Sequence, residues 1–313
     1  MALKIALVWN PTKTTREELE TALASAERDA AETVSAEWFE TSPDDPGRAA
    51  AEAALESGAD VVVAAGGDGT VRAVAEVLAE RETTADLAIA PLGTGNLLAR
   101  NLEVPIDDLS AAFGRALSGA PRSIDAGWVA IDGGEKQAFA VIVGFGIDAH
   151  MMTETDEDLK SKVGWLAYLA SAGKAVSASE VIDVRIGIDG AEPESRKAHT
   201  LMVGNCGTVQ GGLTLLPDAD PADGTLDLLV VDAEGIGGWA DTVRNLLWDN
   251  GLKRVLPGAV AERAEDGDAI AHERGTAIRI ELGEPREIEL DGDVVGKARL
   301  LEIEVQPGAL RVR

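Results

Sequence analysis

The sequence contains a single cysteine, Cys206, and only three histidines, His150, His199 and His272. One cysteine excludes an intramolecular disulfide and a cysteine-based zinc site, and it is typical of a protein from a reducing cytoplasm. The histidines lie far apart in the sequence, with no ligand spacing between them. A bound metal is therefore expected to be a hard cation with oxygen ligands.

Long apolar runs and basic residues are also scarce. No stretch approaches the roughly 18 apolar residues that a membrane helix needs, and the apolar start, Met1 to Trp9, is too short for the core of a signal peptide. We therefore expect a cytoplasmic protein. With 28 Lys and Arg against 55 Asp and Glu, the formal net charge is −27. Because no basic run offsets this charge, nucleic acid is not an expected partner.

The first part of the chain alternates apolar runs with helical patterns, which predicts a doubly wound α/β domain over residues 1–124. Continuous apolar runs are typical of strands that are buried on both faces of a parallel sheet. The expected strands are Leu3–Trp9, Asp60–Ala65 and Leu87–Leu92. The expected helices are Thr15–Ala31, Pro46–Ser57 and Val71–Arg81.

The rest of the chain predicts a mostly antiparallel β-sandwich over residues 125–300, with 301–313 as a terminal strand segment that returns to the first domain. Three Asp-Gly pairs favour hairpin turns: Asp132-Gly133, Asp189-Gly190 and Asp291-Gly292. The expected strands are Trp128–Ile131, Gln137–Val143, Ile182–Ile188, His199–Val203, Leu226–Val231, Ala277–Leu282, Arg286–Leu290 and Leu300–Val305. Two helical segments interrupt them, Asp158–Val176 and Ile236–Leu247.

Two glycine-rich loops follow predicted strands and precede predicted helices: Gly66-Gly67-Asp68-Gly69-Thr70 and Pro91-Leu92-Gly93-Thr94-Gly95-Asn96. Glycines allow a sharp turn and a close ligand, and N–H groups at a helix start attract phosphate. Side by side, the loops would form a phosphate cradle in which Asp68 could hold a magnesium-bound water or a ribose hydroxyl. The alternative is an ordinary strand–helix turn. A P-loop lysine motif and a G-x-G-x-x-G motif are both absent, which excludes those nucleotide-binding solutions.

The two loops, followed by Ala99-Arg100, resemble the diacylglycerol kinase catalytic family of bacterial lipid kinases, to which sphingosine kinases are related. The resemblance continues at Asn10-Pro11, at 144–149, over 205–227 and at 291–293. It implies a kinase that uses ATP and Mg²⁺ to phosphorylate a lipid hydroxyl, with diacylglycerol as the first expectation. It also implies an active site between an α/β nucleotide domain and a β-sandwich.

The resemblance further implies roles for individual residues. Asp293 would be the general base, with Asp68 and Asp148 near a catalytic magnesium. The Asp223 side chain and the backbone carbonyls of Asp220 and Thr225 would bind a second, structural magnesium. The residues implied to contact ATP are Asn10, Pro11, Thr12, Lys13, Thr14, Thr41, Gly67, Asp68, Gly69, Thr70, Val71, Arg72, Ala73 and Thr94.

Two positions depart from the family pattern. Asp293 stands where the family has glutamate, which shortens the base by one methylene, and the loop after the first strand lacks a glycine that is often found there. A shift of about 1 Å can lower a rate on the order of a hundredfold. A catalytically degenerate nucleotide- or lipid-binding protein is therefore an alternative, as is an NAD-kinase-like small-molecule kinase. Asp291-Gly292-Asp293 by itself is also the pattern of an ordinary hairpin.

The segment Asp158–Val176 carries Trp165 and Tyr168 near an apolar face, with lysines around it. This pattern predicts either a helix packed on a sheet or one that contacts a membrane surface and lines the acyl-chain entrance. We expect transient, peripheral contact with the membrane that contains the lipid substrate, although the acidic charge opposes an anionic leaflet. The sequence leaves open which lipid is the acceptor and whether the chain forms a homodimer.

Overall fold

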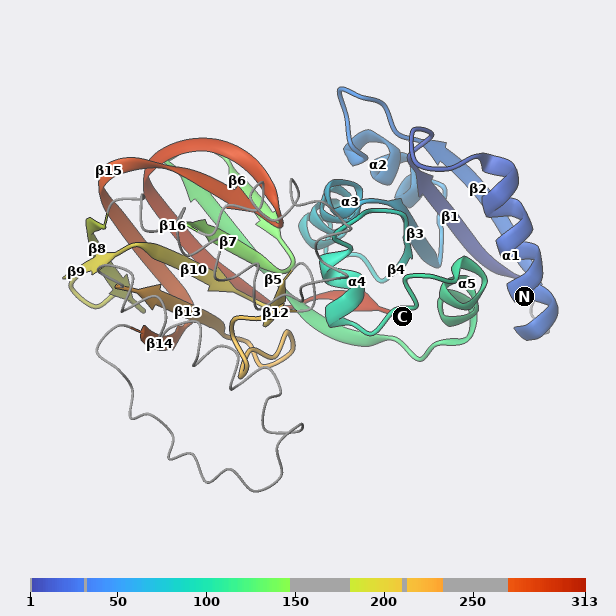
Figure 1. The fold of residues 1–313 in the computed structure, drawn as a ribbon. Helices are drawn as coiled ribbons and strands as arrows, with labels where there is room; N and C mark the ends of the chain where they lie inside the picture. Colours follow the sequence, from blue (N-terminus) through green and yellow to red (C-terminus); the bar gives the residue numbers. More distant parts are fainter. Residues whose placement is uncertain (1, 31–32, 147–180, 210–212, 233–269) are drawn as a thin grey trace, which may run out of the picture.

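The computed structural model describes residues 2–30, 33–146, 181–209, 213–232 and 270–313. Asp148 and the two segments predicted as helices, Asp158–Val176 and Ile236–Leu247, lie outside these residues. The described chain forms two lobes, an α/β lobe and a β-rich lobe, joined by long strands (Figure 1).

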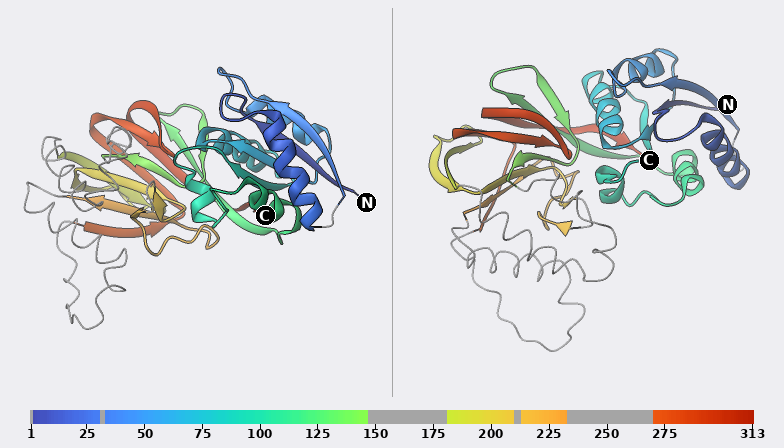
Figure 2. Two further views of the ribbon diagram at one scale, coloured as in Figure 1. Left: turned by 45° about the vertical axis from the view of Figure 1, so that its right-hand side comes forward. Right: turned by 45° about the horizontal axis from the view of Figure 1, so that its top comes forward.

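The first lobe is a parallel sheet in the order β4-β3-β1-β2, with helices on both faces (Figures 1 and 2). This arrangement confirms the predicted α/β class. The elements are β1 Leu3–Trp9, α1 Arg16–Ala30, β2 Val34–Glu40, α2 Arg48–Glu56, β3 Val61–Gly66, α3 Asp68–Glu80, β4 Asp86–Pro91, α4 Leu97–Asn101 and α5 Leu109–Ser118.

Alternate residues of the central strands enter two different cores. In β1, Ile5 and Leu7 pack with residues of α1 and α5, whereas Ala6 and Val8 pack with residues of α2 and α3. Both faces of the sheet are thus covered by helices, and this burial explains the continuous apolar runs in the sequence.

The second lobe is a mostly antiparallel sandwich, as predicted. One layer has the strand order β14-β13-β10-β7, and the end of β15 pairs with β7 at its edge. The other layer contains β9, β8, the start of β15, β16, β5 and β6. β15 therefore takes part in both layers. The elements are β5 Arg122–Ile131, β6 Lys136–Phe139, β7 Ile142–Phe145, β8 Ile182–Ile188, β9 Glu194–Ala198, β10 Thr200–Gly204, β11 Thr208–Val209, β12 Leu213–Thr214, β13 Leu226–Val231, β14 Ile270–Gly275, β15 Ala277–Leu290 and β16 Asp293–Val312.

Several strand boundaries differ from the prediction. β5 and β16 extend well beyond the predicted strands Trp128–Ile131 and Leu300–Val305, and two further predictions divide the chain differently. The predicted strands 277–282 and 286–290 are one strand, β15, whose register shifts between Glu281 and Arg286 as it passes from one layer to the other. The predicted strand 137–143 is instead divided into β6 and β7. It breaks at Ala140 and Val141 because their N–H groups donate to the Asp291 carboxylate.

The three Asp-Gly pairs form the predicted hairpin turns. Both residues of each pair have positive φ, for example 49° at Asp291 and 88° at Gly292. This is the backbone of a type I′ turn, in which aspartate and glycine are favoured. Asp291 and Gly292 therefore form the tip of the hairpin between β15 and β16.

The C-terminal strand runs back to the first lobe. Val312 of β16 pairs with Leu87 of β4. Next to this pair, the buried Asp86 carboxylate accepts from Arg313 Nε at 2.6 Å and lies 3.1 Å from Arg311 Nε. The boundaries at residues 124 and 300 stay a prediction, because β5 and β16 pair with each other across both of them.

No helix within the described ranges combines the length and the apolar character that crossing a membrane requires.

The ion pairs at Asp86 predict that removing the two arginines lowers stability more than removing the aspartate does. Replacing Arg311 and Arg313 together with Ala leaves a carboxylate that is 3% exposed without a cation, which should lower the free energy of unfolding by about 3–5 kcal/mol. Asp86→Ala should cost less, because the Arg311 side chain is 45% exposed and can reach water. Urea denaturation measures both. Glu20→Ala, which breaks an exposed pair with Arg16 but leaves the contact of Arg16 with the Trp38 ring, is the control and should change stability by less than about 0.5 kcal/mol. Equal losses in the two tests would contradict this account.

Candidate active site

Three loops meet at the carboxyl ends of the parallel strands. Backbone hydrogen bonds join neighbouring strand ends, from Asn10 N to Ala65 O at 3.0 Å and from Leu92 N to Gly66 O at 2.9 Å. Open α/β sheets bind ligands at this edge. The two glycine loops therefore lie side by side, next to the loop that follows β1.

Asp68, the first residue of α3, joins the two glycine loops. Its Oδ2 accepts from Asn96 N at 2.9 Å and its Oδ1 from Leu97 N at 2.6 Å. Burial raises the pKa of Asp68, and the charge of Asp293 raises it further, while the backbone hydrogen bonds oppose this shift. Asp68 therefore fixes the start of α4, and it lies close enough to Asp293 of the second lobe for the two charges to interact.

Close contacts account for the glycines. A Cβ on Gly95 would lie 2.7 Å from Asp68 Oδ2, and one on Gly93 would lie 2.8 Å from the Cα of Gly67. Both distances are too short for a side chain. Asn96 closes the second loop with a φ of 49° and two hydrogen bonds to Gly93, both of 2.8 Å. The loops are thus packed backbone against backbone, with no room for a larger residue.

The loop after β1 makes its own turn. Asn10 Oδ1 accepts from Thr12 N at 2.9 Å and from Thr12 Oγ1 at 2.7 Å. The Thr14 hydroxyl donates to Glu18 Oε2 at 2.7 Å, at the start of α1. Of the other residues predicted to contact ATP, Thr41 is buried at the end of β2, and Thr94 is exposed in the second glycine loop.

The two aspartates of the β15–β16 hairpin lie in different environments. Asp291 is buried, and its carboxylate accepts from the N–H groups of Ala140, Val141 and Ile142 at 2.8–2.9 Å. Burial raises the pKa of Asp291 despite these bonds. The Asp293 carboxylate is half exposed and lies 3.1 Å from Arg72 Nη2. Its Oδ2 would also be only 3.3 Å from a Cβ on Gly69. Asp293 therefore stands directly across from the first glycine loop.

The loop predicted to bind a structural magnesium is held by hydrogen bonds. Asp223 Oδ1 accepts from Thr225 N at 2.9 Å and from its hydroxyl at 2.7 Å, and Asp223 Oδ2 lies 3.7 Å from Arg274 Nη1. The Asp220 carbonyl accepts from Asp223 N at 3.3 Å. Asp125 connects the loop to the C-terminal strand by accepting from Gly224 N and Gly308 N. Within the described part of the chain, no three His, Cys, Asp or Glu side chains form a metal-binding group.

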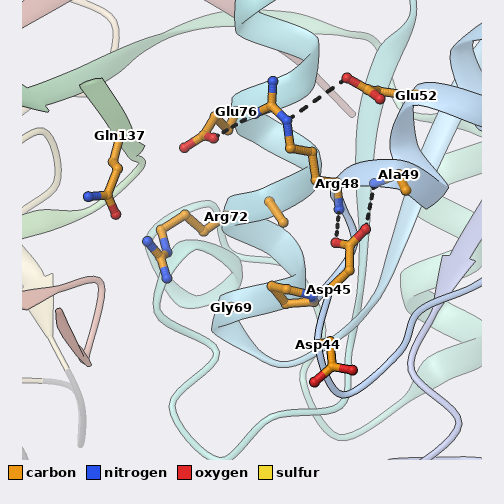
Figure 3. Close-up of a pocket in the computed structure, with 11 residues that line it drawn as sticks. Asp44, Asp45, Arg48, Ala49, Glu52, Gly69, Arg72, Glu76 and Gln137 are labelled. Atoms are coloured by element: carbon orange, nitrogen blue, oxygen red, sulfur yellow. Dashed lines mark hydrogen bonds and ion pairs between the residues drawn. The ribbon is translucent and has the colours of Figure 1, made fainter. Parts of the chain in front are cut away.

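A pocket of about 420 Å³ opens beside the first glycine loop (Figure 3). Its walls come from α2 and the loop before it, from α3 and from Gln137 of β6, so both lobes contribute. Arg72 extends from α3 toward the side from which Gln137 comes. The lining residues are Asp44, Asp45, Pro46, Arg48, Ala49, Glu52, Gly69, Arg72, Ala73, Glu76 and Gln137.

A larger pocket, of about 770 Å³, lies on the sandwich away from the loops. Charged residues on its walls pair with one another, as Lys136 does with Glu304 and Arg185 with Glu281. We interpret it as a solvated sheet surface stabilised by cross-strand ion pairs, because none of the predicted site residues lines it.

Contacts between the lobes were not predicted from the sequence, and two of them join residues that are far apart in the chain. One is the ion pair between Arg72 and Asp293. In the other, the Asn101 side chain donates to Thr208 O at 2.7 Å and accepts from Thr208 N at 3.0 Å. The partners in each pair are more than 100 positions apart, and no local pattern indicates them.

Comparison with known proteins agrees with this arrangement. Residues 4–129 match the diacylglycerol kinase catalytic domain, and residues 141–313 match the YegS C-terminal NAD kinase β-sandwich-like domain. A Pseudomonas aeruginosa protein named "probable lipid kinase YegS-like" is 31% identical over 310 residues, which cover 99% of this chain and 93% of that protein. The chain belongs to the YegS-like lipid kinase family.

Two further proteins are similar to this chain over most of their length. A protein of Bacillus subtilis named diacylglycerol kinase is 27% identical over 252 residues, 80% of this chain and 77% of that protein. The crystal structure of a candidate diacylglycerol kinase from Bacillus anthracis aligns with a TM-score of 0.72 at 26% identity, covering 99% of this chain and 94% of the other. The fold and family expected from the sequence are thereby confirmed. The roles of the individual site residues stay predictions.

The close packing of the loops predicts that Gly95→Ala is harmful. The added methyl group would push Asp68 away from the start of α4, and overpacking of this kind costs about 1–3 kcal/mol of stability. Gly114→Ala in α5 is the control, because a Cβ there meets nothing within 4 Å, and alanine should stabilise the helix by about 0.5–1 kcal/mol. Urea denaturation measures both changes. A Gly95→Ala protein as stable as the Gly114→Ala protein would contradict the packing described.

The burial of the Asp291 carboxylate predicts that replacing it with asparagine lowers stability more than the same replacement of an aspartate that is not buried. In Asp291→Asn, one oxygen becomes an NH₂ group that faces backbone N–H donors, which should cost about 1–3 kcal/mol of stability. Asp45→Asn is the matched control, because Asp45 also accepts from three backbone N–H groups, two on Oδ1 and one on Oδ2, but is only partly buried. Water can replace its lost bonds, so a smaller loss is expected in thermal denaturation. Similar losses would show that burial at 291 is unimportant.

Proposed function

We propose that the protein transfers the γ-phosphoryl group of ATP to a lipid hydroxyl, with diacylglycerol as the acceptor and phosphatidic acid as the product. The observation that carries the proposal is Asp293, a half-exposed carboxylate from the second lobe that faces the glycine loops of the first. Membership of a lipid kinase family and similarity to a relative named diacylglycerol kinase support it.

The proposed reaction uses the two lobes in different ways. Backbone N–H groups of the glycine loops and of the start of α3 bind the phosphates, because such groups favour negative charge. The Asp293 carboxylate accepts the proton of the acceptor hydroxyl. The hydroxyl oxygen then forms a bond to the γ-phosphorus while the bond from that phosphorus to the β–γ bridging oxygen breaks. ADP leaves with the bridging oxygen.

We propose that a magnesium ion binds near Asp68, because each of its two oxygens accepts one N–H group from the start of α4 and keeps a lone pair for a cation. Burial and the charge of Asp293 both raise the pKa of Asp68, and a divalent cation would offset both effects. Asp68 would hold the ion, which when bound neutralises charge on the transferring phosphates. Asp148, the other residue implied by the family resemblance, lies outside the described residues. At the second predicted site, Asp223 Oδ2 forms an ion pair of 3.7 Å with Arg274 Nη1, so a cation bound there would compete with this guanidinium.

A lipid acceptor implies that the protein meets a membrane surface. We propose a transient, peripheral contact. The net charge of −27 opposes approach to an anionic leaflet by about 1 kcal/mol for each charge near the surface. Salt should therefore favour the contact by screening this repulsion.

The proposed function predicts phosphate transfer to diacylglycerol in an acceptor panel with magnesium-ATP. The panel contains diacylglycerol, a sphingoid base, phosphatidylglycerol, an isoprenoid alcohol and NAD, and the labelled product is measured. Transfer to diacylglycerol above the other acceptors is expected. Transfer to NAD but to no lipid would overturn the proposal, and absence of any transfer would favour a binding protein without catalysis.

Asp293→Asn should lower turnover about 10²–10⁴-fold, because the amide cannot accept the proton. Glu304→Gln is the matched control, since Glu304 lies on the same strand, is 50% exposed against 51% for Asp293, and also forms one ion pair with a basic side chain. Unchanged turnover in Asp293→Asn would exclude Asp293 as the base.

A further inference from the structure

One side of helix α3 carries a row of charged residues that contact other elements. Asp68, Arg72 and Glu76 follow each other at intervals of four residues and so lie on one face of the helix. Asp68 bonds to the start of α4, and Glu76 Oε2 accepts from Ala138 N of β6 at 2.8 Å. Arg72, between them, reaches the β15–β16 hairpin. This face of α3 therefore meets the second lobe at several points.

Arg72 is held close to the protein along its length. Its side chain is 18% exposed, and its Nη2 donates to Asp293 Oδ2 at 3.1 Å. Its Nε is buried and has no hydrogen-bond partner among the described residues. The guanidinium is therefore mostly buried, and its Nη2 donates to one specific carboxylate.

The second carboxylate of the same turn, Asp291, lies close enough for the charge of Arg72 to lower its pKa against the effect of burial. Arg72 thus acts on both aspartates of the hairpin tip. Asp291 is already fixed by three backbone N–H groups, whereas the only ion pair of Asp293 within the described residues is with Arg72. The orientation of Asp293 therefore depends on Arg72 far more than that of Asp291 does.

We infer that Arg72 is a positioning residue that holds the Asp293 carboxylate toward the first glycine loop, where a lipid hydroxyl would meet the γ-phosphate. This inference rests on the proposed function. It gives Arg72 a role different from the direct contact with ATP that the family resemblance implies, and the two roles predict opposite kinetics. A positioning residue acts on the chemical step, whereas a nucleotide ligand acts on binding.

Arg72→Gln tests the two roles, because glutamine keeps most of the side chain and removes the charge and the guanidinium fork. We expect kcat to fall about 10–100-fold, as for a catalytic group displaced by about 1 Å. KM for ATP and the dissociation constant of magnesium-ADP, measured by calorimetry, should stay within about threefold. Arg279→Gln is the control. It breaks ion pairs with Glu281 and with Glu302 of β16 and should leave kcat unchanged.

A double variant separates action through Asp293 from a general structural effect. In the Asp293→Asn background, Arg72→Gln should cause no further loss of kcat, because the group that it positions is already inactive. A second pair, Arg72→Lys with Asp293→Glu, shortens one side chain and lengthens the other. The loss of kcat in this double variant should be smaller than the product of the losses in the two single variants.

Three outcomes would overturn the inference: a tenfold or larger loss of nucleotide affinity with normal kcat at saturation, an equal loss in both backgrounds, or normal kcat in Arg72→Gln. The wild-type protein is assayed first on the acceptor panel. Absence of transfer there removes the proposed function and this role with it. Transfer by the wild type that Arg72→Gln does not impair removes this role alone.

Discussion

The carboxylate of Asp68 is the contact on which the arrangement of the site depends. It lies at the first residue of α3 and accepts two N–H groups from the start of α4, so one side chain fixes the distance between the two glycine loops. The loops then pack so closely that Gly93 and Gly95 have no room for a Cβ. Because a methyl group is excluded, backbone N–H groups can approach a ligand directly.

A second buried carboxylate performs the corresponding task in the other lobe. Asp291 binds the backbone where β6 ends and β7 begins, which ties the β15–β16 hairpin to the strand that crosses beside it. Both aspartates are costly to bury, and the pKa of each is raised. Each is nevertheless stabilised by backbone N–H groups, which are rigid donors. The two halves of the site are therefore fixed separately, and their meeting depends on contacts between α3 and the hairpin.

Sequence patterns predicted the fold class and most interior strands, because a strand buried on two faces must be apolar along its length. They missed β2, β9 and β14, which are edge strands of the described sheet and carry alternating or polar residues such as Glu194–Ala198. The two glycine loops were also predictable, since glycine spacing records a local backbone requirement. The pairing of Arg72 with Asp293 was not, because it depends on how two lobes dock across 221 positions.

The three aspartates show why residue type alone does not identify a base. Asp68 and Asp291 have both oxygens occupied by backbone donors, so protonation of either would weaken the contacts that hold the loops and the hairpin. Asp293 is half exposed and contacts a side chain instead of the backbone. Its ion pair with Arg72 is separate from the backbone contacts that hold the loops and the hairpin. Among these three, Asp293 is the most exposed carboxylate, so it is the one that we propose as the base, and the proposed role of Arg72 follows from their ion pair.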